Sequence, residues 1–406
     1  MSYKKVGNYL LIKSIGKGAA GEVFLGLDTK KSSLVAVKAI SAASVEDIKS
    51  KQIFKQSIHI LNSLSHKNII NLISQEKTKN NYYLVLDYAN GGDLYNYLVQ
   101  YRKKHNAPLP EEHVQKIVIQ IADGLEYMHK KNIIHRDIKL ENILINYDNK
   151  EKELLKGNPH NIEPIICGLD EPFTIKIADF GFARELIGNT NATSICGTPS
   201  TMAPDILLHN SKGYNTSVDL WSLGAITFEL IIGEPPFRGD SIKEIFEGVQ
   251  KGKYSYPNNI DISIECISFI NGLLQFDPMK RMDWSNVRKH PFLTGDTKKF
   301  RRINIGMCSK ENKLKEIEMN SRQSDNFLWL IYKDNNKIGV DLDKIEYDWI
   351  KNDVNMSYYE YKLNSEEDNK KDNKDDDWEI ISNKNIEIEP IQQGNNKFTF
   401  NDSYFS

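Results

Sequence analysis

The sequence predicts an α+β fold of two lobes, in which a small β-rich lobe precedes a larger helical lobe and a C-terminal tail follows. Short strand-like apolar runs recur in the first 90 residues around one helical stretch, whereas helical periodicity dominates from residue 94 onward. Sustained apolar patterning ends near residue 294, after which Asn, Lys and acidic residues prevail. A chain of 406 residues is long enough for two or three domains with a large core.

Each element follows from its own pattern. The strand-like runs lie at residues 9–15, 22–27, 34–40, 69–75 and 82–88. Apolar residues at helical spacing between Ile53 and Leu64 predict one helix among these strands. The later helical patterns are clearest over residues 111–129, 218–232 and 262–274. Three prolines and mixed charge over residues 147–173 indicate a surface insertion rather than a further domain.

The composition excludes several classes of protein. A balance of 53 Lys and Arg against 55 Asp and Glu leaves a formal charge of -2, which argues against a general nucleic-acid binder. The four cysteines are too scattered to predict a disulfide framework or a zinc cluster: Cys167, Cys196, Cys266 and Cys308. The N-terminus has no secretory signal, and no uncharged apolar stretch reaches the roughly 18 residues of a membrane span. These features predict a cytoplasmic protein without a transmembrane segment.

A glycine-rich segment, GKGAAG at residues 16–21, lies between the first two predicted strands. Glycines allow backbone amides to approach phosphate groups closely. A strand follows the last glycine, whereas a dinucleotide-binding Rossmann fold requires a helix there, so the sequence excludes that fold. Lys38 ends the next apolar run, where its ammonium group would reach the phosphates of a bound nucleotide.

Two further motifs follow in order, HRDIKLEN at residues 135–142 and DFG at residues 179–181. With the glycine segment and Lys38 they form an ordered set, on which the chain is identified as a member of the eukaryotic protein kinase family, with its two-lobed kinase fold. The resemblance covers about residues 9–294. Four downstream segments extend it, at residues 197–199, 203–205, 219–224 and 277–281.

The resemblance also implies how the chain is divided. The expected parts are an N-terminal extension 1–8, a kinase domain 9–294 with N-lobe 9–86, hinge 87–92 and C-lobe 93–294, and an acidic Asn/Lys-rich regulatory tail 295–406. Within the tail, residues 366–377 are all Glu, Asp, Asn or Lys, which predicts disorder.

The resemblance implies transfer of the ATP γ-phosphate to protein Ser/Thr hydroxyls, with Mg²⁺, or Mn²⁺ in its place. Asp137 would accept or orient the substrate hydroxyl, and Lys139 would support the transferring phosphate. Asn142 and Asp179 would hold two metal ions through oxygen atoms, and Lys38 would hold the α- and β-phosphates. The remaining ATP-binding residues would be Ile15, Gly16, Lys17, Gly18, Gly21, Val23, Ala36, Leu86, Asp87, Ala89 and Leu144.

One departure from the family pattern bears on activity. The glutamate that normally pairs with Lys38 is replaced by Ser57, which cannot supply the countercharge. Misplacement of a catalytic group costs up to roughly 100-fold in rate. We expect a weakened but active kinase, because Lys38, Asp137, Asn142 and Asp179 all remain. The alternative is a pseudokinase scaffold that binds nucleotide and partners with little turnover.

Two further kinds of site are expected, a phosphorylation site on the activation loop and a structural ion pair. Arg136 precedes the catalytic aspartate, an arrangement in which a guanidinium can hold a phosphate on the activation loop. Ser194 is the favoured phosphorylation site, followed by Thr193. Asp205 replaces a glutamate of the family and would pair with Arg281 as a structural ion pair.

Three segments narrow the family: KIADFGFAR at residues 176–184, the insertion before it, and CGTP at residues 196–199. They resemble the autophagy-initiating Unc-type serine/threonine kinases, which implies recruitment to autophagic membranes. The alternative is a calmodulin-kinase-like serine/threonine kinase unrelated to autophagy.

The tail contains a short motif of its own. Trp378 and Ile381 stand three residues apart behind three consecutive Asp residues. In an extended strand these two side chains would fill two pockets while the backbone pairs with a sheet edge. The pattern resembles the motif that binds ubiquitin-like autophagy modifiers. The alternative is a C-terminal strand that docks on the kinase itself.

Overall fold

The fold is described from a computed structural model, in which the chain forms two compact units. The first draws on Met1–Tyr97, Glu141–Arg184 and Asn355–Ser406, and the second on Leu98–Leu140 and Glu185–Val354. The structure describes residues 3–305 except 19–20, 149, 157–160, 166, 187–191, 193, 195, 208–212, 252–253, 255 and 258–259, and it describes residues 380–381.

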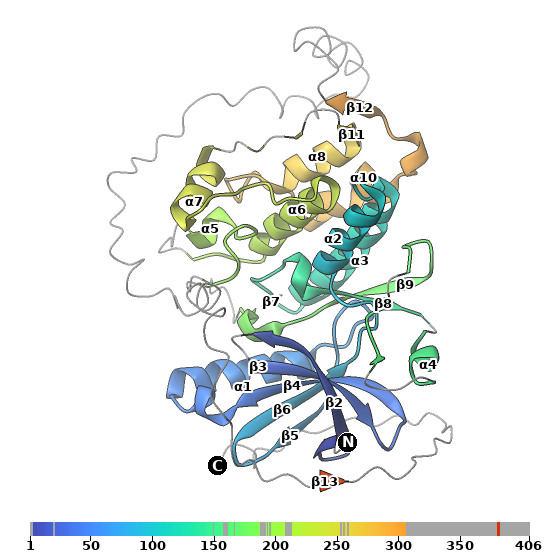
Figure 1. The fold of residues 1–406 in the computed structure, drawn as a ribbon. Coiled ribbons are helices and arrows are strands. Elements are labelled where there is room, and N and C mark those ends of the chain that lie inside the picture. Colours follow the sequence, from blue (N-terminus) through green and yellow to red (C-terminus); the bar gives the residue numbers. More distant parts are fainter. Residues whose placement is uncertain are drawn as a thin grey trace. The chain divides into compact units, whose positions relative to one another are not determined.

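An antiparallel sheet forms the centre of the first unit (Figure 1). Its strands are β1 (Tyr3–Val6), β2 (Tyr9–Gly18), β3 (Gly21–Asp28), β4 (Ser33–Ser41), β5 (Leu72–Lys77), β6 (Asn81–Asp87) and β13 (Ile380–Ile381), in the order β13-β1-β2-β3-β4-β6-β5. Alternate β-branched residues of β4 face one side, as the period of two requires. Val35 and Val37 are buried there against Tyr83 and Val85.

The sequence placed a strand at residues 69–75, but β5 begins at Leu72. Ile69 instead forms an isolated parallel bridge with Ile177, and the Ile70 amide donates to the Ile177 carbonyl at 2.9 Å. The segment before β5 is therefore bonded to a second hairpin of the same unit. That hairpin consists of β8 (Ile143–Tyr147) and β9 (Phe173–Ile177).

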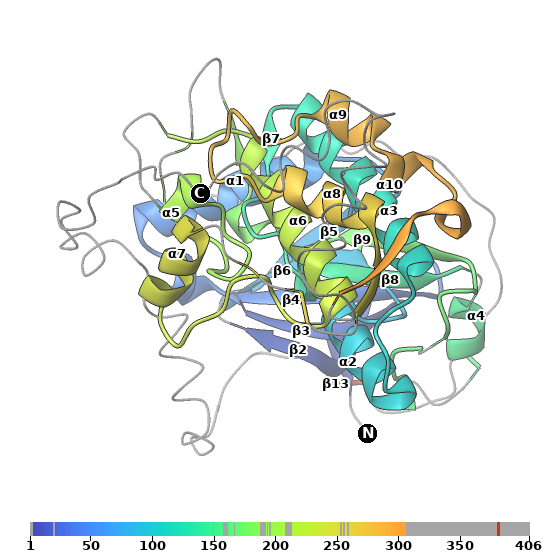
Figure 2. The ribbon, with the colours of Figure 1, turned by 90° about the horizontal axis from the view of Figure 1, so that it is seen from above.

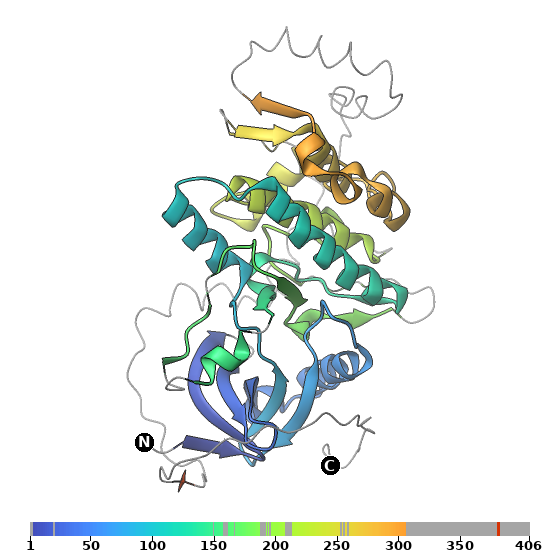
Figure 3. The ribbon, with the colours of Figure 1, turned by 90° about the vertical axis from the view of Figure 1, so that its right-hand side faces the viewer.

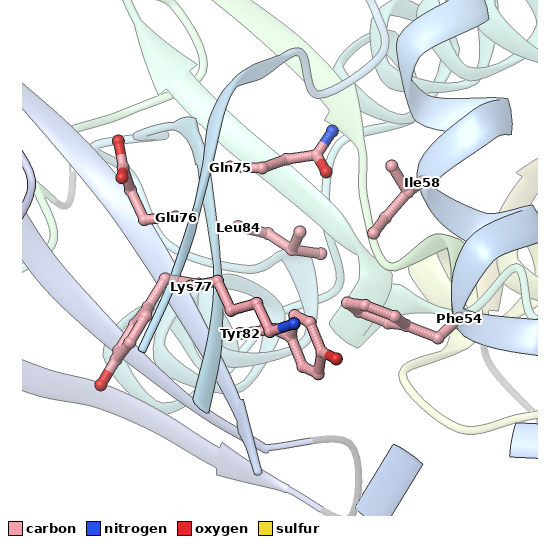
Figure 4. A pocket seen from close by; sticks show the side chains of 8 residues that line it. Phe54, Ile58, Gln75, Glu76, Lys77, Tyr82 and Leu84 are labelled. Carbon is pink, nitrogen blue, oxygen red and sulfur yellow. The ribbon is translucent and has the colours of Figure 1, made fainter. Parts of the chain in front are cut away.

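Helix α1 (Ile48–Ser63) begins where the Asp47 side chain accepts a hydrogen bond from the Ser50 amide. Its apolar face packs on the sheet, where Phe54 and Ile58 join a buried cluster that includes Leu84. Figure 4 shows these side chains around a small cavity between the helix and strands β5 and β6. The helix matches the apolar spacing of the sequence and starts five residues earlier than Ile53.

Two short elements complete the first unit. Helix α4 (Glu151–Leu154) lies towards the other end of β4 from α1 (Figure 3), where Leu154 packs on the cluster of Leu25 and Leu34. The 3₁₀ turn η4 (Phe180–Phe182) follows β9. Both belong to the segment between β8 and α5, so residues distant in sequence from the sheet contribute to the first unit.

Helices dominate the second unit. They are α2 (Leu94–His105, which starts in the first unit), α3 (Glu111–Lys130), α5 (Pro204–Leu207), α6 (Ser217–Ile232), α7 (Ile242–Lys251), α8 (Ile264–Leu273), α9 (Trp284–Lys289) and α10 (Pro291–Thr294), with short β7 (Ile133–Ile134) and β10 (Arg184–Glu185). Helix α6 is central, with α3 and α8 as neighbours (Figure 2). A Cβ on Gly224 would lie 2.7 Å from the Leu273 Cβ, so a glycine permits this approach of α6 to α8. No helix in the described ranges has the length and apolarity of a membrane span.

A two-stranded sheet, β11 (Ile260–Ser263) with β12 (Arg302–Ile305), also belongs to the second unit. The helical pattern expected from residue 262 starts at Ile264, because Ser263 ends β11 and its side chain accepts from the Cys266 amide as the N-cap of α8. Ser263 and Arg302 both bond the buried carboxylate of Glu111. Residues after 294 are therefore part of the folded unit.

His290 is a buried histidine that caps helix α10. Its Nδ1 accepts from the Phe292 amide at 3.2 Å, and its ring packs edge-on against Phe269 at 5.2 Å. Burial lowers the pKa of His290 to about 4, because the charged imidazolium is poorly solvated there. Protonation would also remove the cap acceptor.

We predict that the free energy of unfolding falls as pH drops from about 6.5 towards 4. In this window the unfolded chain binds a proton at residue 290 that the folded chain does not, so acid favours unfolding. His290→Asn retains a cap acceptor that does not titrate and should flatten this part of the profile. Urea denaturation at several pH values measures both slopes, and equal slopes would contradict the role of His290.

Candidate active site

The glycine segment forms the end of the β2–β3 hairpin, where Gly18 pairs with Gly21. Gly21 has φ +125°, and a Cβ there would lie 2.1 Å from the Ala39 carbonyl oxygen, so only glycine fits. At Gly16 and Gly18 a Cβ would meet open space. The backbone of this hairpin is therefore accessible to a ligand.

Strand β4 presents the predicted lysine. Lys38 pairs in register with Leu84 and Ala36 with Leu86, and the two-residue spacing puts Lys38 and Ala36 on one face. The Lys38 Nζ lies 3.0 Å from the Asp179 Oδ1. The lysine side chain is 16% exposed and that of the aspartate 43% exposed. Two predicted site residues that are 141 positions apart are thus brought together.

Asp179 has an unusual backbone. Its φ of 60° and ψ of 82° lie in the left-handed region, which is uncommon for a residue with a side chain. Its carboxylate accepts from the Gly181 amide at 3.3 Å, which caps η4. This conformation turns the Asp179 carboxylate towards Lys38.

Ser57 lies on α1, where the family has a glutamate. Its hydroxyl donates to the Ile53 carbonyl one turn earlier at 3.0 Å. No carboxylate therefore approaches Lys38 from this position of the helix. Within the described residues, the ion pair of Lys38 is with Asp179.

Asn142 and Asp179 offer the oxygen atoms that Mg²⁺ prefers. The Asn142 carbonyl accepts from the Ala178 amide at 2.8 Å, so Asn142 is bonded to the residue directly before Asp179. In the described ranges no three His, Cys, Asp or Glu side chains form a metal-binding group. The donor set fits Mg²⁺, which usually takes one or two protein carboxylates and completes its shell with water and phosphate oxygens.

The predicted hinge begins at the end of β6. The Asp87 carboxylate accepts from the Asn71 side chain at 2.8 Å and pairs with Lys176 at 3.0 Å. These bonds hold the Asp87 side chain in place, and the Asp87 amide donates to the Asn71 carbonyl at 3.1 Å. Ala89 is buried. The side chains of Val23, Ala36, Leu86 and Leu144 are half-buried, whereas Ile15 and Lys17 are exposed.

In the second unit, Asp137, Lys139 and Thr198 form one hydrogen-bonded group. The Thr198 hydroxyl donates to the Asp137 Oδ1 at 2.7 Å, and the Lys139 Nζ donates to the Thr198 Oγ1 at 2.9 Å. Lys139 also lies 3.3 Å from the second oxygen of Asp137. All three side chains are largely buried or half-buried, which strengthens their electrostatic interaction.

The backbone before Asp137 is fixed by Asp219 of α6. The Asp219 carboxylate accepts from the amides of His135 and Arg136 at 2.9 and 2.8 Å. It also contacts the His129 Nε2 at 2.8 Å. Because Trp284 donates to the His129 Nδ1, the proton of a neutral His129 is on Nε2 and points at Asp219. Burial opposes ionisation, but the bonds from His129 and His135 outweigh it and lower the pKa of Asp219.

Arg136 connects this backbone to the activation segment. It has φ 69°, and a Cβ on Gly197 would lie 2.4 Å from its carbonyl oxygen. The Arg136 guanidinium donates to the Ser194 hydroxyl at 2.7 Å and to the Tyr214 hydroxyl at 3.1 Å. A phosphate on Ser194 would therefore meet an arginine that is already in place.

Asp205 and Arg281 form a buried ion pair at 2.7 Å. The guanidinium also donates to the carbonyls of Gln275 and Ser217 and lies over the Trp221 ring. The pair is therefore fully hydrogen-bonded, which a buried charge requires.

Two predicted residues, Thr193 and Trp378, lie outside the described residues, whereas Ile381 lies in β13. The sequence interpretation did not assign roles to Asp219, His129 or Trp284. The segment DLWSLG, which contains Asp219, was a usable signal, but its bonds to the HRD backbone required the fold.

Comparison with known proteins agrees with this geometry. The family model for the protein kinase domain matches residues 9–293. The chain therefore belongs to the protein kinase family.

Among curated proteins, it is similar to the serine/threonine-protein kinase ATG1 of three organisms. Identity is 32% over 317 residues to that of Kluyveromyces lactis (72% of this chain, 37% of the relative). It is 32% over 295 residues to that of Dictyostelium discoideum (71% and 40%). It is 33% over 346 residues to that of Saccharomyces cerevisiae strain S288c (78% and 36%). The chain thus spans less than half the length of these relatives.

Proposed function

We propose that this chain is an ATP- and Mg²⁺-dependent protein serine/threonine kinase that acts in the initiation of autophagy. The observation that carries the catalytic part is the bonded group of Asp137, Thr198 and Lys139. The similarity to ATG1 kinases supports the autophagy role.

In the proposed reaction, a substrate serine or threonine hydroxyl approaches Asp137, which orients it and takes its proton as the new oxygen–phosphorus bond forms. The bond from the γ-phosphorus to the ADP oxygen breaks at the same time. Lys139 is positioned by Thr198 and Asp137 to stabilise negative charge on the transferring phosphate. In this scheme Asp137 aligns the substrate hydroxyl and Lys139 stabilises charge. These roles fit phosphoryl transfer, which needs alignment and charge stabilisation more than covalent catalysis.

On the nucleotide side, we propose that the glycine hairpin covers the phosphates and that Lys38 pairs with the α- and β-phosphates. Asn142 and Asp179 would hold Mg²⁺, which when bound neutralises phosphate charge. The ammonium of Lys38 lies 3.0 Å from the Asp179 Oδ1 and so orients this carboxylate before nucleotide arrives. Adenine would bond to the backbone of Asp87 and Ala89.

A pseudokinase remains the second candidate, because Ser57 removes the usual partner of Lys38. Nucleotide binding alone does not separate the two functions, since ligand binding stabilises an active and an inactive kinase alike. Only turnover separates them.

We predict measurable transfer of radiolabelled phosphate to Ser/Thr peptides, reduced at least about 100-fold in Asp137→Asn because the proton acceptor is lost. Ser57→Glu should raise the rate, by up to about 100-fold if it restores full alignment of Lys38. Gln56→Glu, an exposed neighbour on α1, is the matched control and should leave the rate unchanged.

Transfer by the unmodified chain no greater than that by Asp137→Asn would rule out the active kinase. An equal gain from Gln56→Glu and Ser57→Glu would mean that general charge, and not a restored pair with Lys38, raised the rate.

We further propose that Ser194 is phosphorylated in the active enzyme and that Arg136 binds the phosphate. A charge-assisted hydrogen bond is worth about 1.5–3 kcal/mol, so Ser194→Ala should lower activity at least about tenfold. Thr193→Ala is the neighbouring control. Phosphopeptide mapping that finds Ser194 unmodified in active enzyme would contradict the assignment.

We also propose that the tail motif at Trp378 and Ile381 binds a ubiquitin-like autophagy modifier and recruits the chain to autophagic membranes. The antiparallel pairing of β13 with β1 supports an extended strand that can join a sheet edge, and it equally fits docking within the chain. A peptide of residues 372–385 should bind such a modifier and lose binding in Trp378→Ala. Equal binding by both peptides would refute the motif.

A further inference from the structure

The insertion between β8 and β9 contains a segment, residues 161–165, that we call the strap. Its second residue, Ile162, is only 4% exposed and belongs to a buried cluster with Leu25 of β3 and Leu34 of β4. The neighbours packed on this cluster come from the sheet, the hinge, the end of α4 and the residue after it: Ile12, Leu27, Tyr88, Leu154 and Leu155. An apolar anchor of this kind is unexpected in a surface insertion.

The strap also bonds to the hinge. The Ile165 amide donates to the Asn90 carbonyl at 2.8 Å. Gly92 has φ +72°, and a Cβ there would lie 3.3 Å from the Pro164 Cβ, so the strap passes directly over the hinge backbone. Within five residues, the strap therefore contacts both the sheet and the hinge.

The hinge is held from another direction by β8. The buried Asn90 side chain accepts from the Tyr147 amide at 2.8 Å and donates to the Tyr147 carbonyl at 3.0 Å. The Gly91 amide donates to the Ile145 carbonyl, and the Ile145 amide to the Gly92 carbonyl, both at 2.8 Å. With β8 and the strap both attached, the hinge backbone is fixed on two sides.

One ion pair connects the strap to the sheet. Lys13 of β2 pairs with Glu163 at 2.6 Å, and the Glu163 side chain is 77% exposed. An exposed pair contributes little to stability. Glu163 stands between Ile162, which enters the cluster, and Pro164, which meets Gly92, so the pair joins the strap to β2 between its two other contacts.

We propose that Ile162 and Glu163 are positioning residues for nucleotide binding, which act by fixing the hinge backbone against strands β3 and β4. The inference rests on the proposed function, in which adenine bonds to the hinge at Asp87 and Ala89 beneath Ala36 of β4. A site already in its binding geometry loses less conformational entropy when ligand binds, so it binds more tightly. The contacts of the strap are with the sheet and the hinge, where adenine would bind, so its loss should weaken nucleotide binding more than phosphate transfer.

The test measures binding of a fluorescent ATP analogue with Mg²⁺ to the full chain, beside steady-state kinetics. Glu163→Lys places like charges opposite Lys13 at an exposed site, so it should fold normally. We expect its Kd and the KM for ATP to rise about two- to fivefold with kcat changed less than twofold, by the entropy argument above and the modest strength of an exposed pair. The exchanged pair Lys13→Glu with Glu163→Lys should restore both values.

Substitutions of the buried residue Ile162 test its role in anchoring the strap to the sheet. Ile162→Ala should raise Kd at least as much as Glu163→Lys, and Ile162→Val should be close to the unmodified chain. Ile267→Ala in α8 removes an equally apolar buried side chain of the second unit. It controls for general loss of stability and should leave Kd unchanged.

Hydrogen exchange without nucleotide gives a readout that does not depend on kinase activity. The Ile165 amide should exchange faster in Glu163→Lys and Ile162→Ala, because its bond to the Asn90 carbonyl opens more often. Unchanged Kd and exchange in both variants, or an equal rise in Kd in Ile267→Ala, would overturn the proposal. A chain that binds nucleotide but fails to transfer phosphate would contradict the kinase function alone and leave these measurements interpretable.

Discussion

The hydrogen bonds of the Asp219 carboxylate fix the backbone from which the site residues of the second unit project. The carboxylate is fully buried in α6 and accepts three hydrogen bonds, two of them from the backbone amides of His135 and Arg136. A buried charge is tolerated only when it is fully bonded, so this position fixes the chain around it. Arg136 is thereby held at φ 69°, a conformation that residues with side chains seldom adopt. From that backbone, Asp137 and Lys139 point to Thr198, and the Arg136 guanidinium points to Ser194.

In the first unit the equivalent constraint is distributed over backbone pairing. The register of β3, β4 and β6 brings the glycine hairpin, Lys38 and the start of the hinge onto adjacent strands. Asp179 is then brought to Lys38 by a left-handed backbone that follows β9. Ser57 bonds the Ile53 carbonyl, and within the described residues the ion pair of Lys38 is with Asp179. The carboxylate that we propose to hold Mg²⁺ is thus also the countercharge of Lys38.

Local sequence patterns were enough to predict the class of fold and the protein family. The motifs at residues 16–21, 135–142 and 179–181 are contiguous, and their spacing reflects chemistry that needs particular side chains. The class of fold and the family followed from their order, and the family model and the curated relatives confirm both.

The sequence could not predict contacts that depend on distant packing. Ile162 stands in a polar segment, and its burial requires Leu25 and Leu34 from two strands more than 120 residues earlier. The role of Asp219 likewise requires that α6 pack beside the HRD segment. The helix predicted from residue 262 begins two residues later, at Ile264. The reason is that Ile262 and Ser263 belong to β11 and pair with β12.

The β11–β12 pairing has a practical consequence for work with shortened proteins. A chain cut where the kinase family model ends, at residue 293, would lack Arg302 and the whole of β12. The carboxylate of Glu111, which is 7% exposed, would then lose its cationic neighbour, and β11 would be left as an open strand edge. Open edges invite pairing between copies. A truncated enzyme intended for crystallisation or assay should therefore extend through Ile305.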